Sequence, residues 1–388
     1  MGGDFFEITF NLVKLVVIFL LMVQLVPILV WAERRVSAFI QNRFGPNRVG
    51  PLGLTQLIAD AVKFIWKEEF APQKGVRFVY YAAPVVALIP AALALGSIPL
   101  SVPFKMEPFE LFGQLWGGSY IFPMQSFEMP IGIVYILGVS SLGAYSLLMA
   151  GWGSSSKYSL MGAMRASAQM ISYELPMAMA IIGVVLIYGT FQLEPMIAAQ
   201  EGLLNFTFWG SQITLPLPNW GLFYQPLGAL LFFVSAFAES NRLPFDLPEA
   251  EGELVAGFHT EYGGFKMNVF FMGEYGHMMV SSSLFIIFYL GGYHIPWVSI
   301  DTVQSIIKSG LGVAGESSTL LSLLVSLTYL LVFAVKLLIL LAVFIWVRWT
   351  LPRFRYDQLM DLGWKKMLPW ALGNAFVTAV VIYVAGLK

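Results

Sequence analysis

The sequence contains no cysteine and only three histidines, and these absences limit the chemistry that the chain can perform by itself. Without thiolates it cannot hold an iron–sulfur cluster through cysteine or form a disulfide. His259, His277 and His294 are too scattered to suggest a haem pair or a metal site. We therefore expect no iron–sulfur cluster, haem, flavin, metal or covalently bound cofactor on this chain. Any electron transfer must use redox centres carried elsewhere.

Charged residues are also scarce. They make up 12% of the chain, whereas a soluble domain has about 25%. Hydrophobic residues make up 58%, which is the composition of an integral membrane protein in contact with membrane lipid. The net charge is -1, so the sequence offers no basic surface for a polyanion, and we exclude nucleic acid as a partner.

Eight apolar segments are long enough to cross a membrane, which takes about 20 mostly apolar residues. They predict an all-α integral membrane protein, a bundle of about eight transmembrane helices that forms a single polytopic domain over residues 1–388. Prolines inside them predict kinks at Pro27, Pro84, Pro90 and Pro176. The segments are approximately 8–31, 78–99, 129–151, 164–189, 222–240, 273–292, 321–347 and 367–386.

Lysines and arginines are distributed unevenly between the loops. The loops after the first, third, fifth and seventh segments carry most of them, whereas the intervening loops carry only Lys105 and Lys308. The positive-inside rule places the basic loops in the cytoplasm, or in the matrix if the membrane is mitochondrial. We expect a bacterial plasma (inner) membrane with both termini on the outer, periplasmic side. The first segment follows Asp4 and Glu7, and we expect a retained helix there, not a cleaved signal.

The first inner loop, residues 33–77, contains another helical pattern. From Gly53 to Phe70, apolar residues recur every three or four positions, while Asp60, Lys63 and Lys67 share the other face. This predicts a short amphipathic helix that lies either in the membrane interface or against the inner ends of the bundle. The outer loops, 100–127, 190–221 and 293–319, are predicted to cover the outer face, and no chemistry is assigned to them.

The third inner loop, 238–272, contains the densest group of carboxylates. Apolar residues such as Phe245 and Phe258 lie among these acids, which indicates a half-buried segment, although a solvated acidic loop stays open. Crowding and burial raise carboxyl pKa values, so some of these groups could exchange protons near neutral pH. Between Ala238 and Tyr262 there is one cation, Arg242, and there are six acids: Glu239, Asp246, Glu249, Glu251, Glu253 and Glu261.

Ionisable residues inside predicted membrane segments are costly and therefore candidates for function. Glu174 lies near the middle of the fourth segment and Lys336 near the middle of the seventh, and the two are a plausible ion pair. Glu128 opens the third segment. Lys14 is close enough to a helix end for its amine to reach the interface, so no function is predicted for it.

Several motifs together carry a resemblance to a known family. They are E-R-R-V-S-A-F-I-Q-N-R-F-G-P-N-R-V-G at 33–50, Q-L-I-A-D-A-V-K at 56–63, I-S-Y-E-L-P at 171–176, the whole stretch 238–262, and P-R-F-R-Y-D-Q-L-M at 352–360. The chain resembles the quinone-site membrane subunit of respiratory complex I, the proton-pumping NADH:quinone oxidoreductase. In bacteria this family is known as the H subunit.

The resemblance implies a quinone substrate and a tunnel formed by the first inner loop. By motif match, this tunnel would be bordered by Arg34, Phe39, Arg43, Asp60 and Lys63. The implied partners are the peripheral-arm subunits that carry the terminal iron–sulfur cluster, and the neighbouring membrane-arm subunits. The enzyme would be a translocase of which this chain is one subunit, without a redox centre of its own.

The resemblance also implies proton coupling. The carboxylates from Glu239 to Glu261 resemble an acidic funnel that leads from the quinone chamber, and Glu128, Glu174 and Lys336 match the start of a hydrophilic axis. Three other functions stay open: the equivalent subunit of a related proton-pumping hydrogenase or dehydrogenase, an autonomous proton-coupled transporter, and a passive anchor for soluble subunits. The absence of an internal repeat disfavours the transporter.

Overall fold

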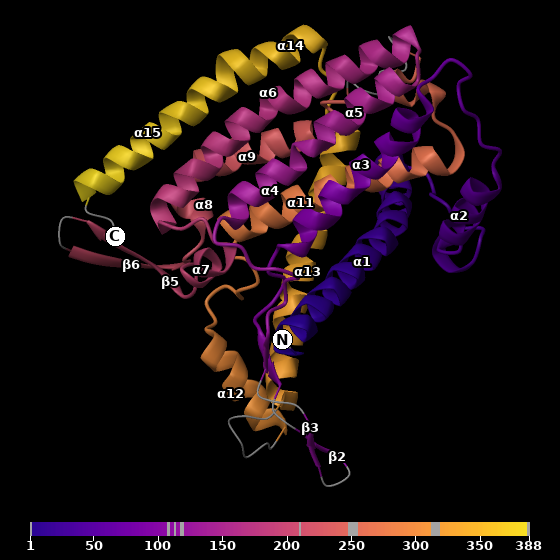
Figure 1. Cartoon of the computed structure of the whole chain (residues 1–388). Coiled ribbons are helices and arrows are strands. Elements are labelled where there is room, and N and C mark those ends of the chain that lie inside the picture. Colours follow the sequence, from indigo (N-terminus) through magenta and orange to yellow (C-terminus); the bar gives the residue numbers. More distant parts are fainter. Residues whose placement is uncertain are drawn as a thin grey trace.

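Helices make up most of the regular structure in the computed structural model, which describes residues 2–106, 109–111, 114–116, 120–208, 211–246, 255–311 and 319–385. Figure 1 shows the long helices packed as one bundle, which confirms the predicted all-α membrane fold. The long helices are α1 (Gly2–Ile40), α3 (Arg77–Gly96), α4 (Gly132–Ser140), α5 (Leu142–Gly153), α6 (Lys157–Tyr188), α9 (Pro226–Glu239), α11 (Gly264–Tyr289), α13 (Thr319–Thr350) and α15 (Leu368–Ala385).

Six of the eight predicted segments, within the described residues, are long and apolar enough to cross a membrane. The third is a pair of helices, α4 and α5, which meet at Ser141. The segment predicted at 222–240 forms the shorter helix α9, because the chain breaks at Gln225 after the single turn of α8 (Gly221–Tyr224). The segment predicted at 273–292 is α11, which begins earlier, at Gly264.

Helices α9 and α11 do not need to be uniformly apolar, because other helices cover them. At 1.5 Å per residue, the 14 residues of α9 span about 21 Å, less than the hydrocarbon thickness of about 30 Å. Helix α11 is buried along most of its length and carries Lys266, Glu274 and His277 on buried positions. Both helices therefore lie where polar groups can find protein partners.

Small residues set the distances between the helices in the middle of the bundle. In lipid there is no hydrophobic driving force between helices, so membrane helices associate where small residues allow close packing. A Cβ added at Gly273 of α11 would lie 2.8 Å from the carbonyl oxygen of Ala87 on α3, and one at Gly276 would lie 2.7 Å from the Cβ of Ala91. These glycines bring α11 against α3. They thereby fix the positions of Glu274 and Tyr275, the two residues that lie between Gly273 and Gly276.

The four prolines predicted to bend helices all lie inside continuous helices: Pro27 in α1, Pro84 and Pro90 in α3, and Pro176 in α6. The last span is irregular for a different reason. It consists of α14 (Tyr356–Asp361), the π-helix η3 (Leu362–Met367) and α15. A π-turn widens the helix and changes which side chains share a face.

One end of the bundle carries the short strands and the shorter helices α7 (Leu193–Ala198) and α12 (Ile300–Leu311). The strands form antiparallel pairs: β1 (Phe104–Met106) with β4 (Tyr120–Phe122), β2 (Phe109–Leu111) with β3 (Gln114–Trp116), and β5 (Leu203–Phe208) with β6 (Ser211–Pro218). In Figure 1 the β2–β3 and β5–β6 pairs extend beyond the helices, whereas α7 lies against the helices of the bundle. These elements come from the three loops predicted on the outer side.

The opposite end of the bundle carries α14, the 3-10 helix η2 (Gly257–Glu261) and the first loop with η1 (Pro51–Gly53) and α2 (Gln56–Trp66). The predicted amphipathic helix is therefore present. No residue of α2 is buried, and Ile58, Ile65 and Trp66 are 68%, 69% and 80% exposed. Figure 1 shows α2 to one side of the bundle. This arrangement favours the interfacial position over one packed against the helix ends.

Candidate functional site

A buried cluster of charged side chains lies where the last turns of α1 and α13 meet the middle of α11. Glu33 of α1 is 7% exposed and forms an ion pair with Arg348 of α13. The Tyr275 hydroxyl of α11 donates a hydrogen bond of 2.5 Å to the other carboxylate oxygen of Glu33. A buried carboxylate is tolerated only when it is paired and hydrogen-bonded, and both conditions are met here.

Tyr275 also connects Glu33 to a second ion pair. The guanidinium carbon of Arg242 lies 4.0 Å from the centre of the Tyr275 ring, a cation–π contact. Arg242 Nη2 lies 3.7 Å from Glu274 Oε2, and both residues are less than 10% exposed. Two carboxylates and two arginines are thereby joined through one tyrosine.

His259 lies beside this second ion pair and is neutral. Its Nε2 is 4.0 Å from Glu274 Oε1. Burial, and then the nearby charge of Arg242, lower the pKa of His259 to about 3. The ring stacks against Phe258 and Phe271. His259 therefore contributes a polar but uncharged surface to the cluster near neutral pH.

A small cavity links Glu274 to the end of α9. Its volume is about 20 Å³, enough for one water molecule. Glu239, Asn241, Glu274 and His277 all line it. Glu239 is the last residue of α9, and its carboxylate accepts a hydrogen bond of 3.1 Å from the Ser281 hydroxyl. The cavity gives the carboxylates of α9 and α11 a shared polar space in the protein interior.

The chain that follows Glu239 is held in the interior by hydrogen bonds. The Gln169 side chain donates to the carbonyl oxygens of Ala238 at 2.8 Å and Phe245 at 2.7 Å. Asp246 is 7% exposed and pairs with Arg353 at 3.0 Å. The part of the predicted acidic stretch up to Asp246 is thus buried and not a solvated loop.

Four other acids belong to the predicted acidic stretch. Glu249, Glu251 and Glu253 lie outside the described residues. Glu261 ends η2, and its backbone carbonyl accepts a hydrogen bond of 2.7 Å from the Tyr80 hydroxyl. Tyr262 stacks on Tyr80, with 4.4 Å between ring centres. The hydrogen bond and the stacking both fasten the end of this loop to α3.

The predicted ion pair between Glu174 and Lys336 is wrong. The Lys336 amine donates to three backbone carbonyls just after α11, those of Leu290, Gly292 and His294, at 2.7 to 2.8 Å. It caps the carbonyl end of a helix, where a cation is favoured. Glu174 instead lies within electrostatic range of Glu239, so it belongs with the inner cluster.

Glu128 lies away from the inner cluster, on the side of the strands. It lines a cavity of about 10 Å³ together with Glu194 of α7. Glu194 accepts a hydrogen bond of 2.7 Å from the Tyr293 hydroxyl. Burial raises the pKa of Glu194; that hydrogen bond opposes the rise, and the charge of Glu128 adds to it. Lys14 lies on the same side and donates to the carbonyls of Pro123 and Gln125.

The residues predicted to border a quinone tunnel occupy the first loop. Arg34 and Asp60 form an ion pair at 2.6 Å that ties α2 to α1. Phe39 is 59% exposed, and Arg43 and Lys63 are also exposed. Among the described residues, no group of three or more His, Asp or Glu is arranged to hold a metal ion.

The comparisons with known proteins agree with one another. A model of the NADH dehydrogenase family matches residues 13–379. A relative in Bdellovibrio bacteriovorus, named as the H subunit of NADH-quinone oxidoreductase, is 63% identical over 388 residues, the full length of both chains. The chain belongs to this family. The H subunit numbered 1 in Geobacter metallireducens is 40% identical over 97% of both chains. A Rhodothermus marinus protein named NADH-quinone oxidoreductase subunit 8 is 41% identical over 91% of both.

Membership of this family confirms the resemblance stated from the motifs, and those motifs contain part of the cluster. Sequence reasoning missed four of the cluster's members as site residues: Glu33, Glu274, Tyr275 and Arg348. A usable signal existed for two of them. Glu274 is a carboxylate at the start of a predicted membrane segment, and Glu33 opens the motif at 33–50. They are linked only through Tyr275 and Arg242, and this link depends on the packing of α1 against α11.

Proposed function

We propose that this chain is the membrane subunit of a proton-translocating NADH:quinone oxidoreductase that forms part of the quinone tunnel and couples quinone reduction to proton translocation. The printed names of its relatives support the enzyme. Its partners would be peripheral-arm subunits that carry the terminal iron–sulfur cluster, neighbouring membrane-arm subunits and membrane lipid. The chain itself would carry no redox centre, and the quinone would be its substrate.

The first loop supports the tunnel. Arg34 and Asp60 pair at its base, and Phe39, Arg43 and Lys63 stand exposed around it. A wholly apolar groove of about 670 Å³ lies between α1, α3 and α11 and includes Phe265, near the start of α11. A long isoprenoid tail needs such lateral access from the bilayer. The exposed polar groups would then border the headgroup.

The contacts of the buried cluster support the coupling. Glu33 lies next to Arg34 in the chain, and from Glu33 the contacts lead through Tyr275 and Arg242 to Glu274. The one-water cavity continues the path to Glu239, which interacts with Glu174. This continuous buried series of charges, from the first loop to the middle of α6, is the observation that carries the proposal.

The magnitude of the coupling is sufficient. At an effective dielectric of about 20, a unit charge that appears about 4 Å from another changes their interaction by about 4 kcal/mol. Because one pKa unit corresponds to about 1.4 kcal/mol, a neighbouring carboxyl would shift by roughly three units. A proton taken up at one carboxylate can therefore release a proton at the next.

The acids of the inner loop take part in the proposal at its quinone end. Asp246, Glu249, Glu251, Glu253 and Glu261 would supply the charge that responds to quinone reduction, and Glu239 and Glu174 would receive the response. Glu128, with Glu194, would continue the polar path on the far side of the bundle. Lys336 would act there as a fixed positive charge and not as a group that exchanges protons, since three carbonyls hold its amine.

The distribution of basic residues supports the orientation. Arg34, Arg242, Arg348 and Arg353 all lie at the end of the bundle that carries α2, η2 and α14. We propose that this end faces the cytoplasm of a bacterium, that the membrane is the inner membrane, and that both termini are periplasmic.

The substitution Glu239→Gln tests the coupling. Glutamine keeps the size of the side chain and can still bond Ser281, so the complex should assemble. We expect proton pumping per NADH oxidised, measured by dye quenching in inverted membrane vesicles, to fall roughly tenfold. Glu174→Gln should lower it in the same direction. Glu201→Gln is the control, because Glu201 accepts a hydrogen bond from the Ile300 amide outside the cluster.

Two results would contradict this proposal. If assembled complex with Glu239→Gln pumps as the wild type does, the buried carboxylates do not couple. If gentle extraction from the membrane yields the chain without iron–sulfur subunits, the chain is not part of an oxidoreductase. A passive anchor would co-purify with those subunits and would pass the second test while failing the first.

A further inference from the structure

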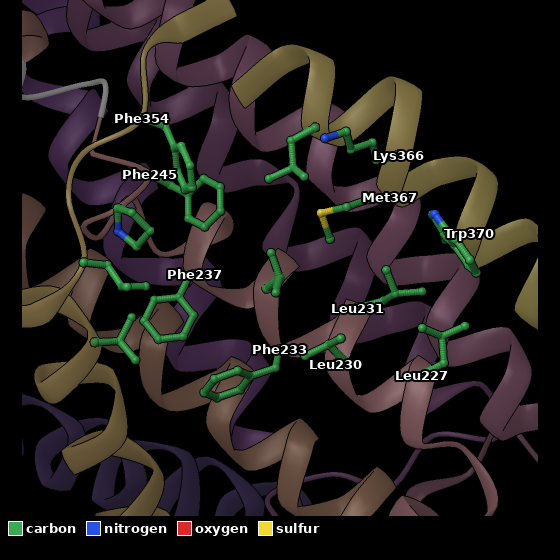
Figure 2. Close-up of a pocket in the computed structure, with 15 residues that line it drawn as sticks. Leu227, Leu230, Leu231, Phe233, Phe237, Phe245, Phe354, Lys366, Met367 and Trp370 are labelled. Atoms are coloured by element: carbon green, nitrogen blue, oxygen red, sulfur yellow. The ribbon is translucent and has the colours of Figure 1, made fainter. Parts of the chain in front are cut away.

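An apolar groove on the outside of the bundle is separate from the path described above. It lies between α9, the end of α13 and the segment η3–α15, and its volume is about 560 Å³ (Figure 2). Its walls are almost entirely apolar, with aromatic rings from Phe233, Phe237, Phe245 and Phe354. Among the described residues, Lys366 is the only charged one that lines it. A single cation beside a long apolar groove restricts what could fill it.

The length of the groove matches one leaflet of a bilayer. Figure 2 shows Phe237 and Leu227 at opposite ends of the α9 wall, and Lys366 on the facing wall between Phe354 and Trp370. The residues of α9 that line it run from Leu227 to Phe237, which is about 15 Å at about 1.5 Å per residue. Half of the hydrocarbon core of a bilayer is also about 15 Å.

The π-helix η3 brings the cation and the apolar wall together. Its hydrogen bonds join residues five apart, as from the Leu368 amide to the Gly363 carbonyl. Positions 362 and 367 therefore lie on one face, and Leu362, Lys366 and Met367 all line the groove. Isolated π-turns are uncommon and occur often at functional sites.

Contacts with α6 hold this irregular turn in place. The Trp364 indole donates to the Ser172 hydroxyl at 3.1 Å, and the Tyr173 hydroxyl donates to the Leu359 carbonyl at 2.8 Å. A Cβ at residue 363 would lie 3.3 Å from the Tyr173 ring, so Gly363 allows the close approach. The position of Lys366 at the edge of the groove is thus built into the fold.

The charge that Lys366 brings to the groove is positive. Lys366 is exposed and has no ion-pair partner among the residues that the structure describes, whereas its neighbour Lys365 pairs with Asp361 at 2.8 Å. Arg355 is exposed at the same end of the last span. A quinone is neutral and offers no anionic group to Lys366. A phospholipid with an anionic headgroup offers one, and its acyl chain has the length of the groove.

We propose that the groove binds an anionic phospholipid. One acyl chain lies along α9 between the phenylalanine rings, and the headgroup phosphate accepts hydrogen bonds from the Lys366 amine. The proposal does not depend on quinone coupling, since no residue of the buried cluster lines the groove. The site would fasten α9 to α15 through the lipid.

The test uses the intact purified complex and lipids that carry a photoreactive group on the acyl chain. Phosphatidylglycerol and phosphatidylcholine with the same chains are compared as probes in detergent, and cross-linked peptides are mapped by mass spectrometry. We expect phosphatidylglycerol to label α9 and α15 peptides about fivefold more strongly than phosphatidylcholine, which is the effect of roughly one basic residue near an anionic lipid.

Two variants and one matched control make the test specific. Lys366→Gln should lower labelling by phosphatidylglycerol about fivefold, whereas Lys365→Gln, next to it but outside the groove, should not change it. Leu230→Trp, at an exposed position of the wall, should block labelling by both lipids. Quinone turnover in the same preparations should be unchanged in Lys366→Gln, which separates this proposal from the one on coupling.

Three results would overturn the proposal. They are equal labelling by the two lipids, labelling of the groove by a photoreactive quinone in their place, and cross-links that put a helix of another subunit there.

Discussion

The middle of α11 and the segment just beyond its end hold buried charge in different ways. In the middle, Glu274 faces Arg242, and Tyr275 joins this pair to Glu33. Just beyond the end, Lys336 is held by three backbone carbonyls. Side-chain partners can rotate or change protonation, whereas carbonyls can do neither. The proposed coupling therefore uses the charges in the middle of α11, and it treats Lys336 as a fixed charge.

The largest effect is expected from Arg242→Met. The change leaves Glu274 without its cation in the interior and removes the contact with the Tyr275 ring. Breaking a buried ion pair by removing one partner costs about 3–5 kcal/mol, so the amount of assembled complex on native gels should fall sharply. Lys308→Met, on a half-buried position of α12 outside the cluster, is the control. Normal assembly of Arg242→Met would show that the inner charges do not support one another.

Lys336→Met should reduce stability and leave coupling intact. Three carbonyls would lose their donor, and an unsatisfied buried polar group costs about 1–3 kcal/mol. We expect a lower melting temperature of the purified complex, with unchanged proton pumping per NADH oxidised in the complex that assembles. The opposite result, normal stability with lost pumping, would make Lys336 a proton carrier. Lys336 and the charges around Glu274 would then no longer differ in role.

His259 should make stability depend on pH. Burial, and then Arg242, lower its pKa to about 3 from 6.5. As the pH falls below about 6.5, the unfolded chain takes up a proton that the folded chain refuses. The stabilisation is therefore complete above this pH and is lost by about 1.4 kcal/mol per pH unit as the pH falls towards 3.

Melting temperatures of the wild type and of His259→Gln between these pH values would measure that contribution. Glutamine does not titrate, so the variant should lose less stability than the wild type as the pH falls. Parallel curves for the two proteins would mean that His259 is protonated in the folded state.

The smallest effect on stability is expected from Asp60→Asn. The pair with Arg34 is partly exposed, with the arginine side chain 48% accessible, and such pairs contribute about 0–1 kcal/mol. Assembly should be normal, whereas the KM for quinone should rise if the first loop borders the tunnel. An unchanged KM would count against that placement, and Lys67→Gln, elsewhere in the same loop, provides the comparison.

The sequence was sufficient for the helices and for one part of the site. Hydropathy alone located α1, α3 and α13, and the density of acids located Glu239 and Asp246. The amphipathic period of residues 53–70 predicted α2. Each of these predictions depends on residues close together in the chain, where spacing determines the geometry.

The remaining features depend on contacts between distant segments. Glu33 and Tyr275 meet because Gly273 and Gly276 allow α11 to approach α3 and α1. The partners of Lys336 are main-chain atoms, which a pattern of side chains does not reveal, and this is why the pair with Glu174 was wrong. Helix α9 was predicted but its length was overestimated, because the apolar residues of α8 precede the break at Gln225.

Helix α2 has its apolar side chains uncovered and is tied by Asp60 to Arg34, the residue beside Glu33. Its height in the membrane therefore bears on the first buried carboxylate of the series. Through this ion pair, a displacement of α2 would be passed directly to the helix that carries Glu33. The first loop is thus a mechanical lever as well as a connection between two helices.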